Sequence, residues 1–580
     1  MNNRSQMWLI VGGAVLALLC LCSVGVFLVG RAFFTIDQNA IISGGDDANS
    51  TAAELTIAVS PGMAPTFNRL VAQFNAQTRE TPDGTPMSIR TVTMAPEKMV
   101  AESLGRPPFQ AIAPDSSLWL NQLDRRWTEA QSESQAVEET IIPIGNRRFD
   151  NPIRYATSPV VIAAWEEVAR DLGWPDQAVG WEDIQRQATA NPNFKWNHPS
   201  TAHASGLLAT LAEFYAGAGL TRGLTPEDAT AESTLDYVRN VEATVRFYGE
   251  GEDVIVQRLA EEGRNFLDAF VTQEQVVIAW NQNYPGDRLV ALYPAEGTLW
   301  ADHPLALLEL GASGEMPVSD NQRRTYQAFT SYLMTQEVQK QLLDAGYRPA
   351  DLDISLEGAG SPFEASDAVD WRQPQTTLQI PSAEVVEVVQ NVWWYTKRPT
   401  NVYLVVDTSG SMGGEKISRT QEALQSFVEQ MRGDRDKIGL ISFSTAVQEL
   451  RSLQALDDAG RNELRTAIAD LQATGETALI DGVWEAYTRL QAVGDAEAIN
   501  AIVVMTDGHE NHSQQSLAEL RRRWESDEGQ GVPIVIFTIA FGDHADEKLL
   551  QRMAEIGEGQ FRRADETDIE ELYKIISTYF

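Results

Sequence analysis

The chain has 580 residues, 43% of them hydrophobic, and its 82 acidic and 45 basic residues give a net charge of -37. At ~150 residues per domain, this length predicts about three folded units. The charge opposes contact with phosphate backbones, so we expect no nucleic-acid partner.

An apolar stretch from Met7 to Gly30 contains roughly two dozen residues without a charge, and at ~1.5 Å of rise per residue it can cross a bilayer. We expect a transmembrane anchor at 7–30 and a flexible stalk rich in Gly, Ser and Asp at 31–53. A cleaved signal peptide is the main alternative, but the apolar run exceeds ~15 residues and lacks a clear cleavage site.

The two cysteines of the chain, Cys20 and Cys22, both lie in this stretch, which excludes a disulfide framework or a cysteine metal site downstream. Each follows a leucine, where a lipoprotein would carry a small residue. Basic residues on both flanks barely favour an N-terminus inside the cell, but the downstream flank soon turns acidic. We therefore expect a single-pass protein of the cell membrane with the bulk of the chain extracytoplasmic.

From Glu54 onward, predicted strands alternate with predicted helices. ELTIAVSP reads as a strand, and the next segment places Phe67, Leu70, Val71 and Phe74 on one helical face. The alternation continues through SIRTVTM, PEKMVAESL, FQAIAP and SSLWLNQLDRRW. This order predicts a largely parallel sheet covered on both faces.

Five segments carry a resemblance to the bilobed extracellular solute-binding proteins of ABC importers, spread over 54–395. They are ELTIAVSPGMAP, RYATSPVVIAAWEEVARDLGWP, WNHPSTAHASGLLATLAEFY, QVVIAWNQNYPGDRLVALYPAEGTLWADHPLALL and AFTSYLMTQEVQKQLLDAGYRP. The resemblance implies one lobe from Glu54 to about Ala156 plus about Pro285 to Asn391, and a second lobe from Ser158 to about Tyr284. Two strands, VVIAAW and QVVIAW, would flank the hinge.

Such proteins bind a ligand between the lobes through serine hydroxyls and backbone N–H groups at helix N-termini, which favour anions. The resemblance places the matching positions at Ser60, Gly62, Ser116, Ser117, Ser158 and Ser205. Each of these residues also suits an ordinary helix cap or turn. Similarly, Trp280 and Tyr284 suit either packing or stacking on a ligand.

The segment 399–580 contains four strongly apolar strands: NVYLVVD, KIGLISFS, INAIVVMTDG and VPIVIFTIAFG. Amphipathic helices separate them, which predicts a doubly wound, Rossmann-like α/β sheet buried on both faces. In such sheets ligands bind beyond the carboxyl ends of the strands, where the strand order reverses.

Five oxygen-bearing side chains follow these strand ends: Asp407, Ser409, Ser411, Thr477 and Asp507. Oxygen donors from three loops suit a hard divalent cation. The plain alternative is that Asp407 and Ser409 only form a turn and cap the next helix, but it leaves Thr477 and Asp507 unexplained.

This constellation resembles the metal ion-dependent adhesion site of von Willebrand factor type A (VWA) domains. The resemblance implies Mg²⁺, with Ca²⁺ or Mn²⁺ as alternatives, ligated directly by Ser409 and Ser411 and directly or through water by the other three. It also implies an open coordination position for an Asp or Glu carboxylate of a protein partner. Glu476 departs from the pattern, because many members have glycine there.

Enzyme motifs fail on inspection. The two histidines of HENH, at 509–512, lack the spacing that puts them on one helical face, Glu415 interrupts a phosphate-loop pattern, and no GxSxG elbow occurs. We therefore expect a metal-dependent binding or adhesion protein rather than an enzyme. The alternative is a transport-associated receptor whose cleft captures a small solute.

Overall fold

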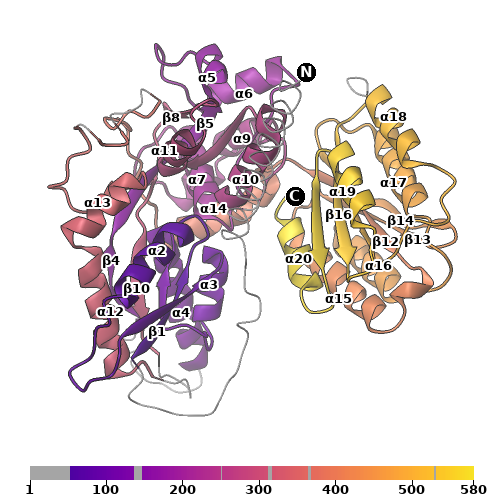
Figure 1. Ribbon diagram of the computed structural model, residues 1–580. Helices are drawn as coiled ribbons and strands as arrows, with labels where there is room; N and C mark the ends of the chain where they lie inside the picture. The colour runs from indigo at the N-terminus through magenta and orange to yellow at the C-terminus, as the bar shows by residue number, and fades with distance from the viewer. Residues whose placement is uncertain are drawn as a thin grey trace, which may run out of the picture. The chain divides into compact units, whose positions relative to one another are not determined.

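The computed structural model describes residues 53–135, 147–249, 251–310, 317–358, 360–363, 368–527 and 531–580 (Figure 1). The predicted anchor, and all of the predicted stalk except its last residue, lie outside these ranges. Within them, no helix combines the length and the apolar character that a bilayer crossing requires.

The first lobe is built on a five-stranded sheet in the order β2-β1-β3-β10-β4. β1 (Glu54–Val59) runs parallel to β2 (Ser88–Thr93) and β3 (Ala111–Ala113), whereas β10 (Pro304–Leu308) is antiparallel to both β3 and β4 (Phe149–Arg154). The sheet is therefore mixed rather than largely parallel. Its helices are α2 (Ala64–Asn75), α3 (Pro96–Ser103), α4 (Ser117–Gln135), α12 (Asp320–Leu333) and α13 (Gln336–Asp344).

The predicted apolar face of α2 is confirmed, because all four of its large side chains are buried. Phe67 and Phe74 meet Phe329 of α12 edge-on, with ring centroids 5.5 and 5.3 Å apart. Aromatic pairs in this geometry add stabilisation beyond their buried area. The contact fixes the start of α2, and with it the loop that carries Ser60 and Gly62.

The second lobe is organised around the long strand β5 (Ala156–Trp165). β5 pairs antiparallel with β7 (Ala269–Gln273), β8 (Leu289–Leu292), β9 (Trp300–Ala301) and β11 (Arg348–Pro349), and β6 (Trp196–Asn197) lies parallel to β7. The remaining elements are α5 (Glu166–Asp171), α6 (Trp181–Ala190), α7 (Ala204–Ala218), α8 (Pro226–Thr230), α9 (Glu232–Glu242), α10 (Glu252–Glu262), η1 (Gly263–Asn265) and α11 (Glu274–Asn283).

Two expectations about this lobe are wrong. QVVIAW lies in helix α11, not in a hinge strand; the helix is buried around most of its circumference, so its sequence lacks the polar face that distinguishes a helix from a buried strand. The lobe also extends beyond Tyr284, since β8 pairs with β5. The later helix α14 (Ala383–Thr396), expected in the first lobe up to Asn391, contacts α7, α8 and α9 of the second lobe and also α4 of the first.

The C-terminal domain contains the predicted doubly wound sheet, with strand order β14-β13-β12-β15-β16-β17. The strands are β12 (Thr400–Asp407), β13 (Lys437–Phe443), β14 (Val447–Ala455), β15 (Ile499–Thr506), β16 (Ile534–Phe541) and β17 (Gln560–Ala564). All neighbours run parallel except the edge strand β14. The order reverses at β12, so its carboxyl end opens the crevice where ligands bind in such sheets.

Helices cover both faces of this sheet (Figure 1). They are η2 (Gly410–Met412), α15 (Glu415–Gln430), α16 (Asp458–Ala469), α17 (Leu479–Val493), α18 (Leu517–Asp527), α19 (Glu547–Ile556) and α20 (Ile569–Ser577). Alternate residues of β12 join opposite cores: Leu404 packs in the cluster of Phe427, whereas Tyr403 packs in the cluster of Tyr487. This two-sided burial explains why β12 is continuously apolar from Val402 to Val406, just before Asp407.

Candidate metal centre and interlobe cleft

Asp407 ends β12 at the point where the strand order reverses, and its side chain is buried. One carboxylate oxygen accepts the backbone N–H of Ser409 at 2.7 Å, and the other accepts the hydroxyl of Thr506. Burial raises the pKa of Asp407 against these hydrogen bonds, and nearby Asp507 raises it further. A cation placed between the two carboxylates would relieve this cost.

The first and third predicted loops are joined through hydroxyl groups. The Oγ atoms of Ser409 and Ser411 lie 2.9 Å apart, and Ser411 Oγ donates a hydrogen bond to Asp507 Oδ1 at 2.6 Å. Asp507 follows β15 directly, and its carboxylate is buried. Four of the five predicted ligands therefore converge at one end of the sheet.

Thr477 approaches the same place from the second loop. Gly410 N–H donates to the Gly475 carbonyl at 3.0 Å, which ties this loop to the first. A Cβ atom built on Gly508 would lie 3.5 Å from Thr477 Oγ1 and 3.6 Å from Ser411 Oγ, so both hydroxyls border the same small space. Glu476 is exposed, and its backbone N–H donates to Thr445 Oγ1 at 3.0 Å.

Two residues that the sequence interpretation missed complete this centre. Lys416, in the first turn of α15, forms an ion pair with Asp507 Oδ2. Its ammonium group thus lies against the Asp507 carboxylate, a predicted metal ligand. This contact shows that the carboxylate attracts a positive charge at this place. Asn511 positions Thr477, since its Oδ1 accepts the Thr477 N–H at 2.9 Å and its own N–H donates to the Thr477 carbonyl.

The histidine-containing loop at 509–512 has a local structural role. The Glu510 carboxylate accepts backbone N–H groups of Ile480, His512 and Ser513 at 2.7 to 3.0 Å, and so holds the loop against the start of α17. His509 Nδ1 lies 3.6 Å from Asp546 Oδ2. These contacts show how the loop presents Asn511 to Thr477.

The five serines predicted for the interlobe cleft divide into two groups. Three have hydroxyls engaged in the fold: Ser116 Oγ accepts the Leu118 N–H, Ser117 bonds Asp302, and Ser158 Oγ accepts the Gln275 N–H at 3.2 Å. Ser60 Oγ and Ser205 Oγ are buried, and neither has a hydrogen-bond partner among the described residues. These two hydroxyls remain available to a ligand.

Two buried carboxyl groups lie beside the predicted positions, and no sequence motif marks them. The Asp115 carboxylate accepts the N–H of Ala204 at the start of α7, one residue before Ser205. Glu252 begins α10, and a Cβ built on Gly62 would lie 3.9 Å from its Oε2. Asp115 thus takes one N–H at the N-terminus of the helix that carries Ser205. This arrangement disfavours oxyanion binding at this place.

Burial raises the pKa of Glu252 to about 7, against hydrogen bonds from its own backbone and from Gln273. Burial also raises the pKa of Asp115 well above its ordinary value, and Glu252 adds to the rise. One further oxygen of each carboxyl group, Asp115 Oδ1 and Glu252 Oε1, has no partner among the described side chains and backbone. The two buried acids therefore interact with each other, carry one unpartnered oxygen each among the described residues, and have raised pKa values that favour a proton on the carboxyl group.

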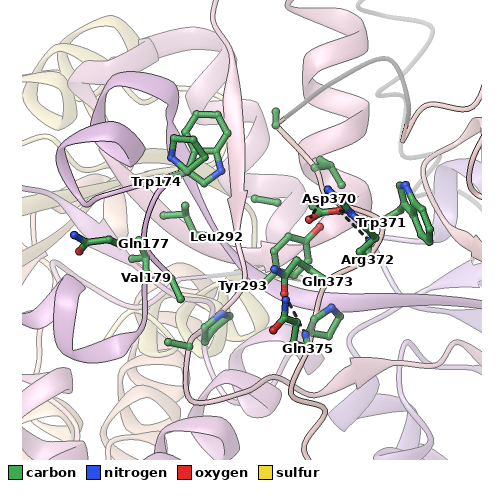
Figure 2. Close-up of a pocket in the computed structure, with 18 of the residues that line it drawn as sticks. Trp174, Gln177, Val179, Leu292, Tyr293, Asp370, Trp371, Arg372, Gln373 and Gln375 are labelled. Atoms are coloured by element: carbon green, nitrogen blue, oxygen red, sulfur yellow. Dashed lines mark hydrogen bonds and ion pairs between the residues drawn. The ribbon is translucent and has the colours of Figure 1, made fainter.

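A separate cavity of about 920 Å³ lies in the second lobe (Figure 2). Trp174, Val179, Leu292 and Tyr293 line one part of it, and the segment around Trp371 lines another. None of the predicted site residues contributes to its wall.

Fold and sites together define a bilobed solute-binding module followed by a doubly wound α/β domain whose candidate cation centre lies at its switch point. A family model described as bacterial extracellular solute-binding protein matches residues 55–348, and the von Willebrand factor type A domain model matches 401–575. The chain belongs to the bacterial extracellular solute-binding protein family and carries a C-terminal VWA domain.

Relatives resemble the C-terminal part. Inter-alpha-trypsin inhibitor heavy chain H4 from Sus scrofa is 30% identical over 28% of this chain and 18% of its own length. The human H4 chain is 29% identical over 30% of this chain and 19% of its own length. The chain thus spans about a fifth of the length of these relatives.

Solved structures resemble each part separately. A von Willebrand factor type A protein from Catenulispora acidiphila is 20% identical, covering 31% of this chain and 43% of its own, with a TM-score of 0.28. The sulfate-binding protein SubI from Mycobacterium tuberculosis is 17% identical, covering 52% of this chain and 88% of its own, with a TM-score of 0.35.

Proposed function

We propose that the VWA domain binds a divalent cation, Mg²⁺ first and Ca²⁺ or Mn²⁺ as alternatives, and through it an acidic side chain of a protein partner. The observation that carries this proposal is the convergence of three loops at the β12 switch point, where Ser411 bonds both Ser409 and Asp507. Mg²⁺ prefers six oxygen ligands in octahedral geometry and accepts water among them.

Each residue has a role in this proposal. Ser409 and Ser411 would supply hydroxyl ligands, and Thr477 would bind directly or through water. Asp407 and Asp507 roughly neutralise a dication without filling its coordination sphere. The bound cation would supply Lewis acidity to a partner's carboxylate at the open position. This is a docking chemistry, and we assign no catalytic role.

The proposed setting is the outer face of the cell membrane. The uncharged stretch at 7–30 would anchor the chain in a single pass, leaving the rest extracytoplasmic. Its length and lack of charge support this placement, as does membership of an extracellular family. Protease treatment of intact cells tests it, because a C-terminal epitope that survives would contradict the topology.

A second proposed function is capture of a small solute by the bilobed module, in the manner of a transport-associated receptor. The free hydroxyls of Ser60 and Ser205, together with the buried acids Asp115 and Glu252, favour a solute that carries hydrogen-bond donors, such as an ammonium group. Thermal stabilisation of the full chain by such a solute would support this function.

Partner capture tests the leading proposal. The full chain in detergent should retain extracytoplasmic proteins in Mg²⁺ and release them in EDTA, and Asp407→Asn should retain none. Capture that EDTA leaves unchanged would contradict metal-dependent docking.

A further inference from the structure

A second group of potential metal ligands lies in the second lobe, away from the VWA domain. His198 follows β6, Glu213 lies in the middle of α7, and Glu242 ends α9. All three side chains are fully buried, and one ligand atom from each lies within 4.8 Å of the other two. Buried charges are costly unless they are paired or bind a metal.

The histidine is held in the orientation of a metal ligand. His198 Nδ1 lies 2.8 Å from the Pro199 carbonyl oxygen, which can only accept, so Nδ1 carries the proton. Nε2 then presents a lone pair toward Glu242 Oε2 at 3.3 Å. A backbone carbonyl that fixes the tautomer in this way is the usual support of a metal-bound histidine.

The 3.3 Å between His198 Nε2 and Glu242 Oε2 fits a direct ion pair with a protonated imidazole, and it also fits two ligands of one ion. Two ligands at ~2.05 Å from a tetrahedral zinc ion lie about 3.3 Å apart. A neutral Nε2 and an ionised carboxylate have no proton between them, so they repel unless a cation or an added proton intervenes. The observed 3.3 Å is the edge length that a shared ion requires.

Hydrogen bonds orient the Glu242 carboxylate, as they commonly do for a carboxylate that binds a metal. Trp393 Nε1 donates to its Oε1 at 2.8 Å, and the Tyr248 hydroxyl donates to its Oε2 at 2.8 Å. Tyr248 in turn accepts the backbone N–H of Arg398, just before β12. These donors orient the carboxylate while leaving a lone pair free on the oxygen that faces His198.

Glu213 provides the independent observation. Both of its carboxylate oxygens are buried, and neither has a hydrogen-bond partner among the described residues. No hydrogen bond among the described residues therefore holds the carboxylate in its present orientation, and one of its oxygens already lies within 4.8 Å of the other two ligand atoms. Two carboxylates and one neutral imidazole balance a dication; without an ion, protons must balance this charge, and the pKa values of Glu213 and His198 are both raised.

We propose that His198, Glu213 and Glu242 form a site with three protein ligands for a divalent transition metal, zinc in first place. The mixed nitrogen and oxygen donor set suits zinc better than magnesium. Through Glu242 and its donors, the ion would tie α7 and α9 to α14, the helix that precedes the VWA domain. The site is distinct from the proposed magnesium centre and does not depend on it.

Metal analysis of the purified full chain tests this site. After dialysis against Mg²⁺, the unmodified chain should retain about one zinc per molecule, Glu213→Gln should retain less than a tenth of that, and Asp407→Asn should retain the same as the unmodified chain. A zinc content near zero in the unmodified chain supplied with zinc, or an unchanged content in Glu213→Gln, would overturn the proposal.

Thermal unfolding separates the site from a shared proton. A metal site predicts that Glu213→Gln unfolds at a lower temperature, because the ion is lost; a protonated Glu213 predicts no change or a rise, which would overturn the proposal. Should the variant fail to fold, zinc-edge X-ray absorption of the unmodified chain decides. A first shell of nitrogen and oxygen at ~2.0–2.1 Å supports the site, and sulfur or an octahedral aqua ion overturns it.

Discussion

Ser411 Oγ and Asp507 Oδ1 are joined by a 2.6 Å hydrogen bond between loops that lie 96 positions apart in the chain. The bond brings a hydroxyl and a carboxylate together at the carboxyl end of a parallel sheet. A divalent cation at this place would take over the two oxygens as ligands. The cation would therefore replace one local interaction with several, and would couple the loops more tightly.

Replacing Asp407 by asparagine should weaken Mg²⁺ binding by roughly a hundredfold, about 2.7 kcal/mol. The change removes one of two charges that balance the dication while preserving the shape of the side chain. Titration calorimetry on the full chain measures it, and the exposed Asp434→Asn is the control that should bind as before. Unchanged binding in Asp407→Asn would show that this carboxylate is not a ligand.

Lys416→Met should tighten Mg²⁺ binding by roughly tenfold, about 1.4 kcal/mol. The ammonium group pairs with Asp507 and so competes with an arriving cation for the same carboxylate. Arg419→Met is the matched control, since Arg419 lies on the same helix and pairs with the exposed Glu415 and Glu422. Weaker binding in Lys416→Met would mean that the lysine helps to build the centre.

The sequence predicts the C-terminal domain better than the bilobed module. Strands buried on both faces are strongly apolar, as β12 is from Val402 to Val406, and Asp407 marks the end of that strand clearly. The sequence does not predict the edge strands β14 and β17, because they mix polar with apolar residues and are only partly buried. QVVIAW reads as a strand although it is helical, because a largely buried helix and a buried strand share the same continuous run of apolar residues.

The candidate sites show the same division. The first and third metal loops follow directly from strand ends, so their residues can be placed from the chain order. Lys416 and Asn511 act through contacts between loops, which spacing alone does not reveal. Asp115 and Glu252 come together only because β3 ends shortly before one and α10 begins at the other, and no motif surrounds either residue.

The buried acid Glu252 should make stability depend on pH. Its pKa is about 7 in the fold and 4.5 unfolded, so the folded chain binds the extra proton between these values. The stabilisation is complete below pH 4.5 and is lost as the pH rises through about 7. Glu252→Gln should therefore gain up to about 3 kcal/mol relative to the unmodified chain over this range.

Thermal unfolding of the full chain from pH 4.5 to 8 measures this difference. Glu261→Gln, an exposed position on the same helix, should follow the unmodified chain throughout. Burial lowers the pKa of His303 to about 3, so His303 makes stability rise with pH, opposite to Glu252. Both chains contain His303, so the difference between them cancels its effect. A constant offset between Glu252→Gln and the unmodified chain would contradict the account.

The cleft should not take up sulfate. Asp115 already accepts the N–H at the start of α7, and a second buried acid lies nearby. In the unmodified chain, sulfate and chloride at equal ionic strength should give the same unfolding temperature. In the double variant Asp115→Asn, Glu252→Gln, sulfate should raise the unfolding temperature above that in chloride. Saturable sulfate binding to the unmodified chain, seen by calorimetry, would refute this expectation.

Diffraction from crystals soaked in Mn²⁺ would locate the cation in the VWA domain, because manganese scatters anomalously and can replace magnesium in oxygen sites. We expect one anomalous peak in this domain, about 2.2 Å from Ser409 Oγ and Ser411 Oγ and close to Asp407, Thr477 and Asp507. No peak at this position under saturating Mn²⁺, with the five side chains well defined, would contradict this expectation.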